Sequence, residues 1–315
     1  MKNLTFNKLF LYISIFTAGA FAFSYGFATV AGDSPYPDAV LAKLEKHMNG
    51  AQLPVDIAKE WNSSEIKEIE VTTGSVSVEL AKSSDAVIRA HLKGISNPSS
   101  KIEFEVNNGR LSVRVNNRSG LHWTFNSDVQ VSMTARELKL YISLPENYHG
   151  PIKVVTGSGD ISSRSVHLKE AEVRTGSGDI EFKGLTSDRL SISTGSGDLS
   201  ASGRVTQFTA KTGSGEISLE DVIGDSLEIS TGSGDISLEN PDFQKISTQA
   251  SSGDVSVKLG GDAARWTAHA ATSSGDIDSN LPNADRSKSS KLFDAGTGKS
   301  RIDVSTSSGD IQITL

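Results

Sequence analysis

Apolar and polar residues alternate along most of the chain, in a pattern that returns about every 19 residues. In each copy, mostly apolar residues stand seven and five positions before a glycine and two positions after it. Around Gly159 these residues are Ile152, Val154 and Ile161, and a polar residue separates the first two. Alternation with a period of two is typical of strands that have one buried and one exposed face. Each copy therefore predicts two short strands, one on each side of a tight turn.

The turn has its own repeated sequence. It reads Thr-Gly-Ser-Gly-Asp-Ile at 156–161 and recurs closely at 175–180, 194–199, 212–217 and 231–236, with looser copies at 250–255, 272–277 and 306–311. Glycine accepts a positive φ without a Cβ clash, so the second glycine of each copy is predicted to be a structural turn residue. These glycines are Gly159, Gly178, Gly197, Gly215, Gly234, Gly253, Gly275 and Gly309.

The period indicates the shape of the fold. A βαβ unit needs about 30 residues, which is more than one repeat provides. A parallel β-solenoid fits, because each coil stacks about 4.8 Å from the last and identical residues form ladders. Eight coils in chain order would make a rod about 38 Å long. A β-meander closed into a barrel or sandwich is the alternative, but it gives less reason for identical residues in every turn. We predict an all-β, β-helix-like parallel solenoid with irregular ends.

The first 31 residues are predicted to be an export signal. Lys2 and Lys8 precede an apolar stretch at 9–27, and small residues such as Ala28 and Ala31 offer cleavage sites. The alternative is an uncleaved anchor, because the apolar run approaches the roughly 20 residues that span a bilayer. The protein is thus expected to be exported: periplasmic, on the outer surface, secreted, or membrane-anchored if the segment is retained.

Residues 32–64 are predicted to be a linker and a short helix. Asp38 is a candidate N-cap, Gly50 follows the last turn, and one stripe carries Val40, Leu41, Leu44 and Met48. The helix is either a cap on an open solenoid end or a loose tether.

Residues 65–315 are predicted to be one solenoid domain, regular in the middle and irregular at both ends. Near the first end, 118–128 breaks the rhythm with Trp123 and Phe125, which either pack over the solenoid or form an exposed contact patch. Near the other end, 280–299 lengthens the last repeat. The chain then stops on an alternating strand that includes Ile313. Unless 280–299 folds over that edge, the strand is free to pair with a second copy.

The amino-acid composition argues against several classes of function for this protein. The chain of 315 residues has a net charge of −7 and pI ≈ 5.4, so no basic field favours nucleic acid. It contains no cysteine, which excludes disulfides, thiol catalysis and cysteine-ligated metals.

A column of acids follows the second glycine of each turn. One explanation is a row of Ca²⁺ ions, as in calcium-binding β-rolls, with Asp160, Asp179, Asp198, Asp235 and Asp254 as candidate ligands. The other is that each Asp accepts backbone N–H bonds from its own glycine-rich turn. Calcium needs six to eight oxygens, which one carboxylate and one hydroxyl per turn do not supply, so we favour the second explanation and expect no metal or cofactor.

A serine also precedes the second glycine in all eight copies: Ser158, Ser177, Ser196, Ser214, Ser233, Ser252, Ser274 and Ser308. A nucleophile needs a single site with a base beside it, so eight equivalent serines indicate a hydroxyl ladder along the rod.

The strand ending at Leu144-Pro145, the serial Thr-Gly-Ser-Gly-Asp-Ile turns and the closing Thr-Ser-Ser-Gly-Asp-Ile-Gln-Ile together resemble the bacterial putative-adhesin repeat family. The resemblance covers roughly 65–315. It implies a β-solenoid-like fold and a cell-envelope setting, and it supplies no catalytic residues.

We therefore expect a non-enzymatic, adhesin-like scaffold that binds glycan or protein surfaces through repeated weak contacts. One alternative is a carbohydrate-active β-helix enzyme of the polysaccharide-lyase type, by fold analogy alone. Its candidate residues on the outer face, Glu172, Arg174 and Lys211, form no convincing catalytic set. The other alternative is a self-assembling envelope protein that associates through its C-terminal strand.

Overall fold

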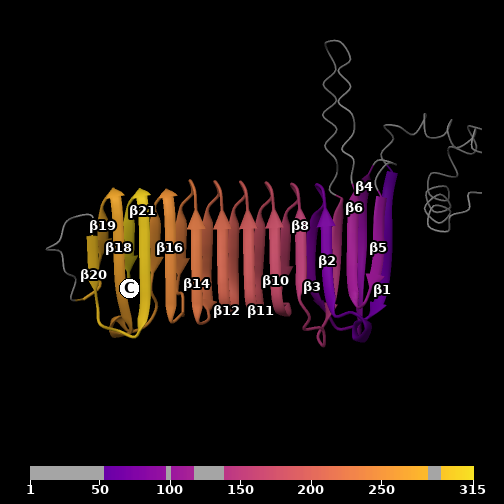
Figure 1. Cartoon of the computed structure of the whole chain (residues 1–315), viewed down its shortest axis with the longest axis horizontal. Coiled ribbons are helices and arrows are strands. Elements are labelled where there is room, and N and C mark those ends of the chain that lie inside the picture. The colour runs from indigo at the N-terminus through magenta and orange to yellow at the C-terminus, as the bar shows by residue number, and fades with distance from the viewer. Residues whose placement is uncertain (1–52, 97–100, 117–137, 283–291) are drawn as a thin grey trace, which may run out of the picture.

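The structure is a computed structural model that describes residues 53–96, 101–116, 138–282 and 292–315. Its strands stand side by side along a rod, and the chain passes around the rod once per repeat (Figure 1). The predicted parallel β-solenoid is confirmed. The proposed signal segment, the helix at 38–50 and Trp123 and Phe125 lie outside the described residues, as does 283–291 of the late insertion.

Each coil contributes to two faces. Face I carries the strands before the glycine turns, with their neighbours at the ends: β2 (Glu68–Thr73), β5 (Lys101–Asn107), β6 (Arg110–Asn116), β8 (Ile152–Thr156), β10 (His167–Thr175), β14 (Ser226–Thr231), β16 (Lys245–Ser252), β18 (Trp266–Ser274), β20 (Leu292–Ala295) and β21 (Ser300–Ser308).

Face II carries the strands after the turns, again with their neighbours: β1 (Leu53–Asn62), β3 (Ser77–Ser83), β4 (Val87–Ser96), β7 (Lys139–Pro145), β9 (Ile161–Arg164), β13 (Ile217–Ile223), β15 (Ile236–Glu239), β17 (Val255–Lys258), β19 (Ile277–Ser279) and β22 (Ile311–Thr314). Two long strands, β11 (Ile180–Thr194) and β12 (Leu199–Thr212), run from face II of one coil into face I of the next. Two short 3₁₀ turns, η1 (Ser63–Glu65) and η2 (Ala263–Arg265), precede β2 and β18.

Neighbouring coils pair in parallel and in register, so that equivalent residues face each other. One step of the repeat is a residue shorter than its neighbours. The pairing of β11 with β12 shifts between Phe182 and Leu185, and the pairing of β12 with β13 shifts back between Ala201 and Gly203. The missing residue is thus absorbed at one bend, and the ladders continue on either side of it.

The core lies between the two faces and is built of columns of apolar side chains that continue from coil to coil. The first inward position of the strand before each turn is at most 2% exposed in every coil. In spatial order this column is Ile152, Ala171, Leu190, Phe208, Leu227, Ile246, Ile302 and Ala268. Burial against both neighbouring coils is what stabilises a repeat that has no closed core of its own.

The coils at both ends are stacked out of chain order, so the expectation of eight consecutive coils is wrong there. The last coil, β21–β22, lies between β16–β17 on one side and β18–β19 on the other. At the opposite end, β2–β3 lies between β6–β7 and β8–β9. In each case the chain runs outward and then returns, so that the inserted coil pairs along both of its edges.

The edge expected at the C-terminal strand does not exist. β22 is paired with β17 and with β19, and Ile313 is fully buried. The premise that this strand is free to pair with a second copy is therefore wrong.

Antiparallel strands complete the two ends. β5 pairs with β6, β4 with β7 and β1 with β4 at the N-terminal end, and β20 pairs with β18 at the C-terminal end. Within the described residues, the outermost strands are therefore β1 and β5 at one end and β19 and β20 at the other.

Candidate functional site

The turns form a continuous row along the rod, which we call the turn edge: the Thr-Gly-Ser-Gly-Asp segments of all coils. Its first residue is a buried threonine that joins two coils. The Thr175 hydroxyl donates to the carbonyl oxygen of Gly159 in the preceding coil and accepts the N–H of Gly178 in its own turn, both at 3.0 Å. The same pair of bonds recurs at Thr194, Thr212 and Thr231.

Sequence reasoning assigned this hydroxyl ladder to the wrong residue. The eight serines are all exposed, and within the described residues their hydroxyls make no hydrogen bond to the protein. The signal that identifies the threonines was present, because Thr156 continues the inward alternation of Ile152 and Val154 and therefore faces the core.

The second glycines are required for a reason other than a positive φ. Only Gly275 among the eight has one, at +159°. A Cβ on Gly197 would lie 1.9 Å from the carbonyl oxygen of Gly178, and a Cβ on Gly178 would lie 2.1 Å from that of Gly159. Real Cβ atoms do not approach so closely, so the close stacking of one turn on the next excludes any side chain at these positions.

The acids that follow these glycines bind backbone, but in the neighbouring coil. Oδ1 of Asp160 accepts the N–H of Asp179 at 3.0 Å, and Oδ1 of Asp179 accepts the N–H of Asp198 at 2.9 Å. The series continues through the inserted coil. Oδ1 of Asp254 accepts the N–H of Asp310, and Oδ1 of Asp310 accepts the N–H of Asp276. The prediction that each Asp accepts backbone N–H bonds is confirmed for these residues, but the donor lies in the next coil and not in the aspartate's own turn.

Glu216 interrupts this series. Asp198 accepts the N–H of Glu216 at 2.9 Å, but within the described residues Glu216 accepts no bond from Asp235. The additional methylene of glutamate carries its carboxylate away from the next backbone N–H. The series resumes where Asp235 accepts the N–H of Asp254 at 2.8 Å.

The acidic row is exposed to solvent and its members are one strand spacing apart, about 4.8 Å. Two charges at that distance repel by about 1 kcal/mol in water. In each linked pair the backbone bond uses one carboxylate oxygen and leaves the other toward solvent. Across the described ranges, no three acidic or histidine side chains gather into a group that could hold a metal ion. The expectation that the row binds no calcium therefore stays a prediction to be tested.

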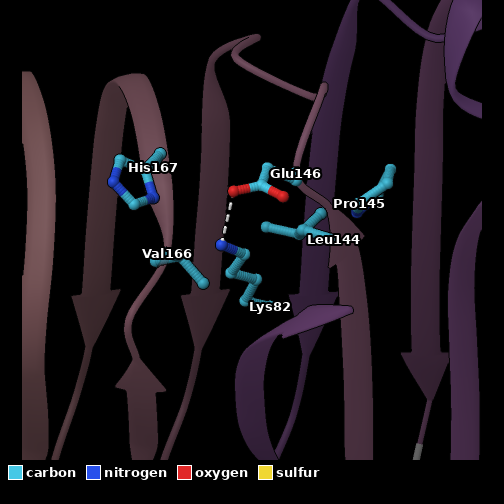
Figure 2. Close-up of a pocket in the computed structure, with 6 residues that line it drawn as sticks. All are labelled: Lys82, Leu144, Pro145, Glu146, Val166 and His167. Atoms are coloured by element: carbon cyan, nitrogen blue, oxygen red, sulfur yellow. Dashed lines mark hydrogen bonds and ion pairs between the residues drawn. The ribbon is translucent and has the colours of Figure 1, made fainter. Parts of the chain in front are cut away.

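A shallow hollow lies where β7 ends, lined by Lys82, Leu144, Pro145, Glu146, Val166 and His167 (Figure 2). It has room for about one water molecule, at ≈ 10 Å³. Lys82 Nζ lies 2.7 Å from Glu146 Oε1, and the hydrogen bond from Lys82 lowers the pKa of that exposed carboxyl. The two charges neutralise each other, and the hollow is too small to hold a substrate.

Of the candidate catalytic residues on face I, Glu172 and Arg174 pair with each other, and Lys211 is held in a separate ion pair. Glu172 lies 3.1 Å from Lys153 and 2.8 Å from Arg174. Lys211 lies 3.1 Å from Glu228, two coils away from Glu172. The three therefore do not converge on one groove, and their arrangement is that of charged residues on a solvated sheet face.

The geometry defines a class of protein: a β-solenoid whose polar groups are ordered in ladders, with no convergent cluster of unlike groups among the described residues. The chain belongs to the Toastrack family, DUF4097, whose sequence profile matches residues 66–314. Comparison with curated proteins gives no match.

Several solved structures are similar to this chain over most of its length. A putative adhesin from Parabacteroides distasonis ATCC 8503 is 12% identical with a TM-score of 0.50, over 82% of this chain and 97% of that one. A putative adhesin from Parabacteroides merdae ATCC 43184 is 11% identical, with a TM-score of 0.45 and coverage of 85% and 97%. A third, from Bacteroides fragilis NCTC 9343, is 13% identical, with a TM-score of 0.44 and coverage of 83% and 97%. The predicted family resemblance is confirmed. Among the described residues, no helix has the length and apolar character to cross a bilayer.

Proposed function

We propose that this protein is an exported, non-enzymatic scaffold of the cell envelope that binds an extended glycan or protein surface through repeated contacts. One observation carries the proposal: chemically equivalent polar groups recur coil after coil on the outside of the rod. A solved structure of similar fold, described as a putative adhesin from Parabacteroides distasonis, supports the setting, as does the export signal predicted at residues 1–31.

Face II offers one of these repeated surfaces. Ser200, Ser218, Ser237 and Ser256 are paired with one another in register on successive strands. Their side chains alternate with buried ones, so they point away from the core. Four hydroxyls at a spacing of about 4.8 Å present the same donor and acceptor repeatedly to an extended polymer. Each contact is weak, but contacts made together by one partner reinforce one another.

The proposal is tested with the purified exported chain and a panel of envelope and extracellular polysaccharides. We expect one or more polymers to be retained by the protein and recovered at their original length. Shortened polymer chains or new reducing ends would instead establish the carbohydrate-active enzyme, which no observation on face I favours.

A matched pair of variants locates the binding surface. Ser218→Lys with Ser237→Lys places two long side chains on face II, whereas Ser214→Lys with Ser233→Lys places the same two on the turn edge. We expect the first pair to weaken polymer retention at least tenfold and the second to leave it unchanged. Equal retention by both variants would contradict binding through face II.

A further inference from the structure

The two ends of the rod differ from its middle in their exposed apolar surface. Within the described ranges, four large hydrophobic residues are exposed: Ile57 at 38%, Val106 at 44%, Leu292 at 43% and Leu315 at 42%. Ile57 and Val106 belong to β1 and β5, the outermost strands of the N-terminal end. A rod whose core continues from coil to coil exposes its interior only where the stacking stops.

The N-terminal end has an apolar inner surface on both strands. Val55 and Trp61 of β1, and Ile102 and Phe104 of β5, are only partly buried and pack against the last core residues. The rings of Trp61 and Phe104 meet across the two faces at 5.4 Å, and Lys59 Nζ lies 5.4 to 5.7 Å from both ring centroids. Figure 1 shows β1 and β5 together at this end of the rod. Together with Ile57 and Val106, these residues form a surface that we call the open end.

The outer sides of the same strands are protected from a second copy. Asp56 and Glu60 on β1 and Glu103 and Glu105 on β5 are exposed and alternate with the inward residues. Charged side chains on edge strands disfavour pairing between sheets, since they bring like charges together on association. The charge protects the edges of the strands, whereas no described element covers the apolar surface between them.

The chain supplies an occupant of matching chemistry immediately before β1. Residues 38–50 lie outside the described residues, and their sequence predicts a helix with Val40, Leu41, Leu44 and Met48 on one stripe. The eleven helical residues between Asp38 and Gly50 would measure about 17 Å, somewhat less than the roughly 23 Å of the seven residues of β5. Only Ala51 and Gln52 separate Gly50 from β1, so the segment is tethered next to the open end.

We propose that residues 38–50 dock on the open end of their own chain as an amphipathic helix and close the core over Ile57, Trp61, Phe104 and Val106. The tether makes the contact intramolecular, with an effective concentration in the millimolar range, so the helix outcompetes a second copy at ordinary concentrations. The candidate cleavage sites at Ala28 and Ala31 precede the helix, so it remains in the exported protein whether or not the signal is removed.

The test compares two substitutions with the same change of charge in the full exported chain. Leu44→Asp places a carboxylate on the apolar stripe, and Ala42→Asp places one on the opposite side of the same helix. We expect Leu44→Asp to speed amide exchange in β1 and β5 at least tenfold, with β11 unchanged as the internal reference, and Ala42→Asp to behave as wild type. Leu44 precedes the first solenoid strand in the sequence, so the substitution replaces none of the core residues of the solenoid. Unchanged exchange in Leu44→Asp, or equal acceleration in both variants, overturns the proposal.

A second measurement separates the tethered helix from a second copy. Protection of β1 and β5 that is constant over a hundredfold range of protein concentration supports docking in the same chain. Protection that rises with concentration, together with a dimer mass by light scattering, overturns it in favour of association between copies. Because the chain has no cysteine, Leu44→Cys with Val106→Cys also gives a clean cross-linking pair, with Ala42→Cys and Val106→Cys as its control. A short bifunctional maleimide is expected to join the first pair within one chain and to leave the control pair unjoined, and equal joining contradicts the proposal.

Discussion

Single hydroxyl groups decide how the coils are joined at the turn edge. The buried Thr212 hydroxyl links the carbonyl of Gly197 to the N–H of Gly215. The hydroxyl of Thr248, which is also buried, has no hydrogen-bond partner within the described residues. The same chemical group is thus required at one inward position and costs stability at another, because only the first has partners to satisfy it.

Replacement of each threonine by valine, which has nearly the same shape, tests this difference. Thr212→Val leaves a buried N–H and a carbonyl without a partner, so we expect the free energy of unfolding to fall by about 1–3 kcal/mol. Thr248→Val removes an unsatisfied polar atom, and we expect it to rise by about 1 kcal/mol. Urea denaturation of both variants measures the two changes. A shift of the same sign in both would contradict the assigned role of the turn threonine.

Glu216 offers a second test, in the acidic series. Glu216→Asp restores the shorter side chain that accepts the next N–H in the neighbouring coils, so we expect it to stabilise the fold by about 0.5–1.5 kcal/mol. Glu220→Asp, on an exposed residue outside the series, is the control. Denaturation midpoints that move equally in the two variants would show that the carboxylate does not bind the adjoining coil.

At the scale of the elements, the sequence predicted the strands and their alignment better than their order. Equivalent residues such as Leu227 and Ile246 were expected to stack, and β14 and β16 pair them in register. The insertion of β21 between β16 and β18 was not predicted, because a column of similar residues fits any neighbour equally well. Only the long last repeat, which accommodates β20, distinguishes the end from the middle. The bond from each Asp to the next coil was missed for a related reason, since a sequence motif identifies an acceptor but not the coil that supplies the donor.

The inserted coil predicts a stability effect at the C-terminal strand. Ile313 is buried between β17 and β19, so Ile313→Ala should create a cavity and lower the free energy of unfolding by about 2–5 kcal/mol. Gln312→Ala, at the exposed neighbouring position, should change it by less than about 0.5 kcal/mol. Chemical denaturation measures both variants. If Ile313→Ala instead changes only the oligomeric mass in light scattering and leaves stability unaltered, the insertion of β22 is wrong.

For the molecule as a whole, repetition converts local chemistry into extended surfaces. The serines of face II and the acids of the turn edge each form a row along the rod. The ion pairs of face I, such as Lys153 with Glu172 and Lys211 with Glu228, instead lie at separate points along it. A partner of similar length meets the same group many times, whereas a small substrate meets only one or two. This difference is the physical basis for proposing a binding scaffold.

The acidic row also makes a prediction for the entire rod. Because its carboxylates already accept backbone N–H groups in most coils, we expect melting temperatures in Ca²⁺ and in chelator to agree within about 2 °C, which corresponds to less than 1 kcal/mol. Thermal unfolding followed by circular dichroism in the two buffers measures this difference, with Mg²⁺ as the control for ionic strength. An increase of many degrees that is specific to Ca²⁺ would establish the calcium row.

The interleaved final coil has a consequence for biosynthesis. Among the described strands, β18 and its partner β20 are joined to the rest of face I only through β21, so the outer coil has no strand partner on the rod until β21 and β22 have been made. A product cut short before Ser300 would not be a slightly shorter rod, but one with a detached terminal segment and a bare core beneath it. A quality-control protease would meet such a product as misfolded protein, and only chains that include β21 and β22 would persist.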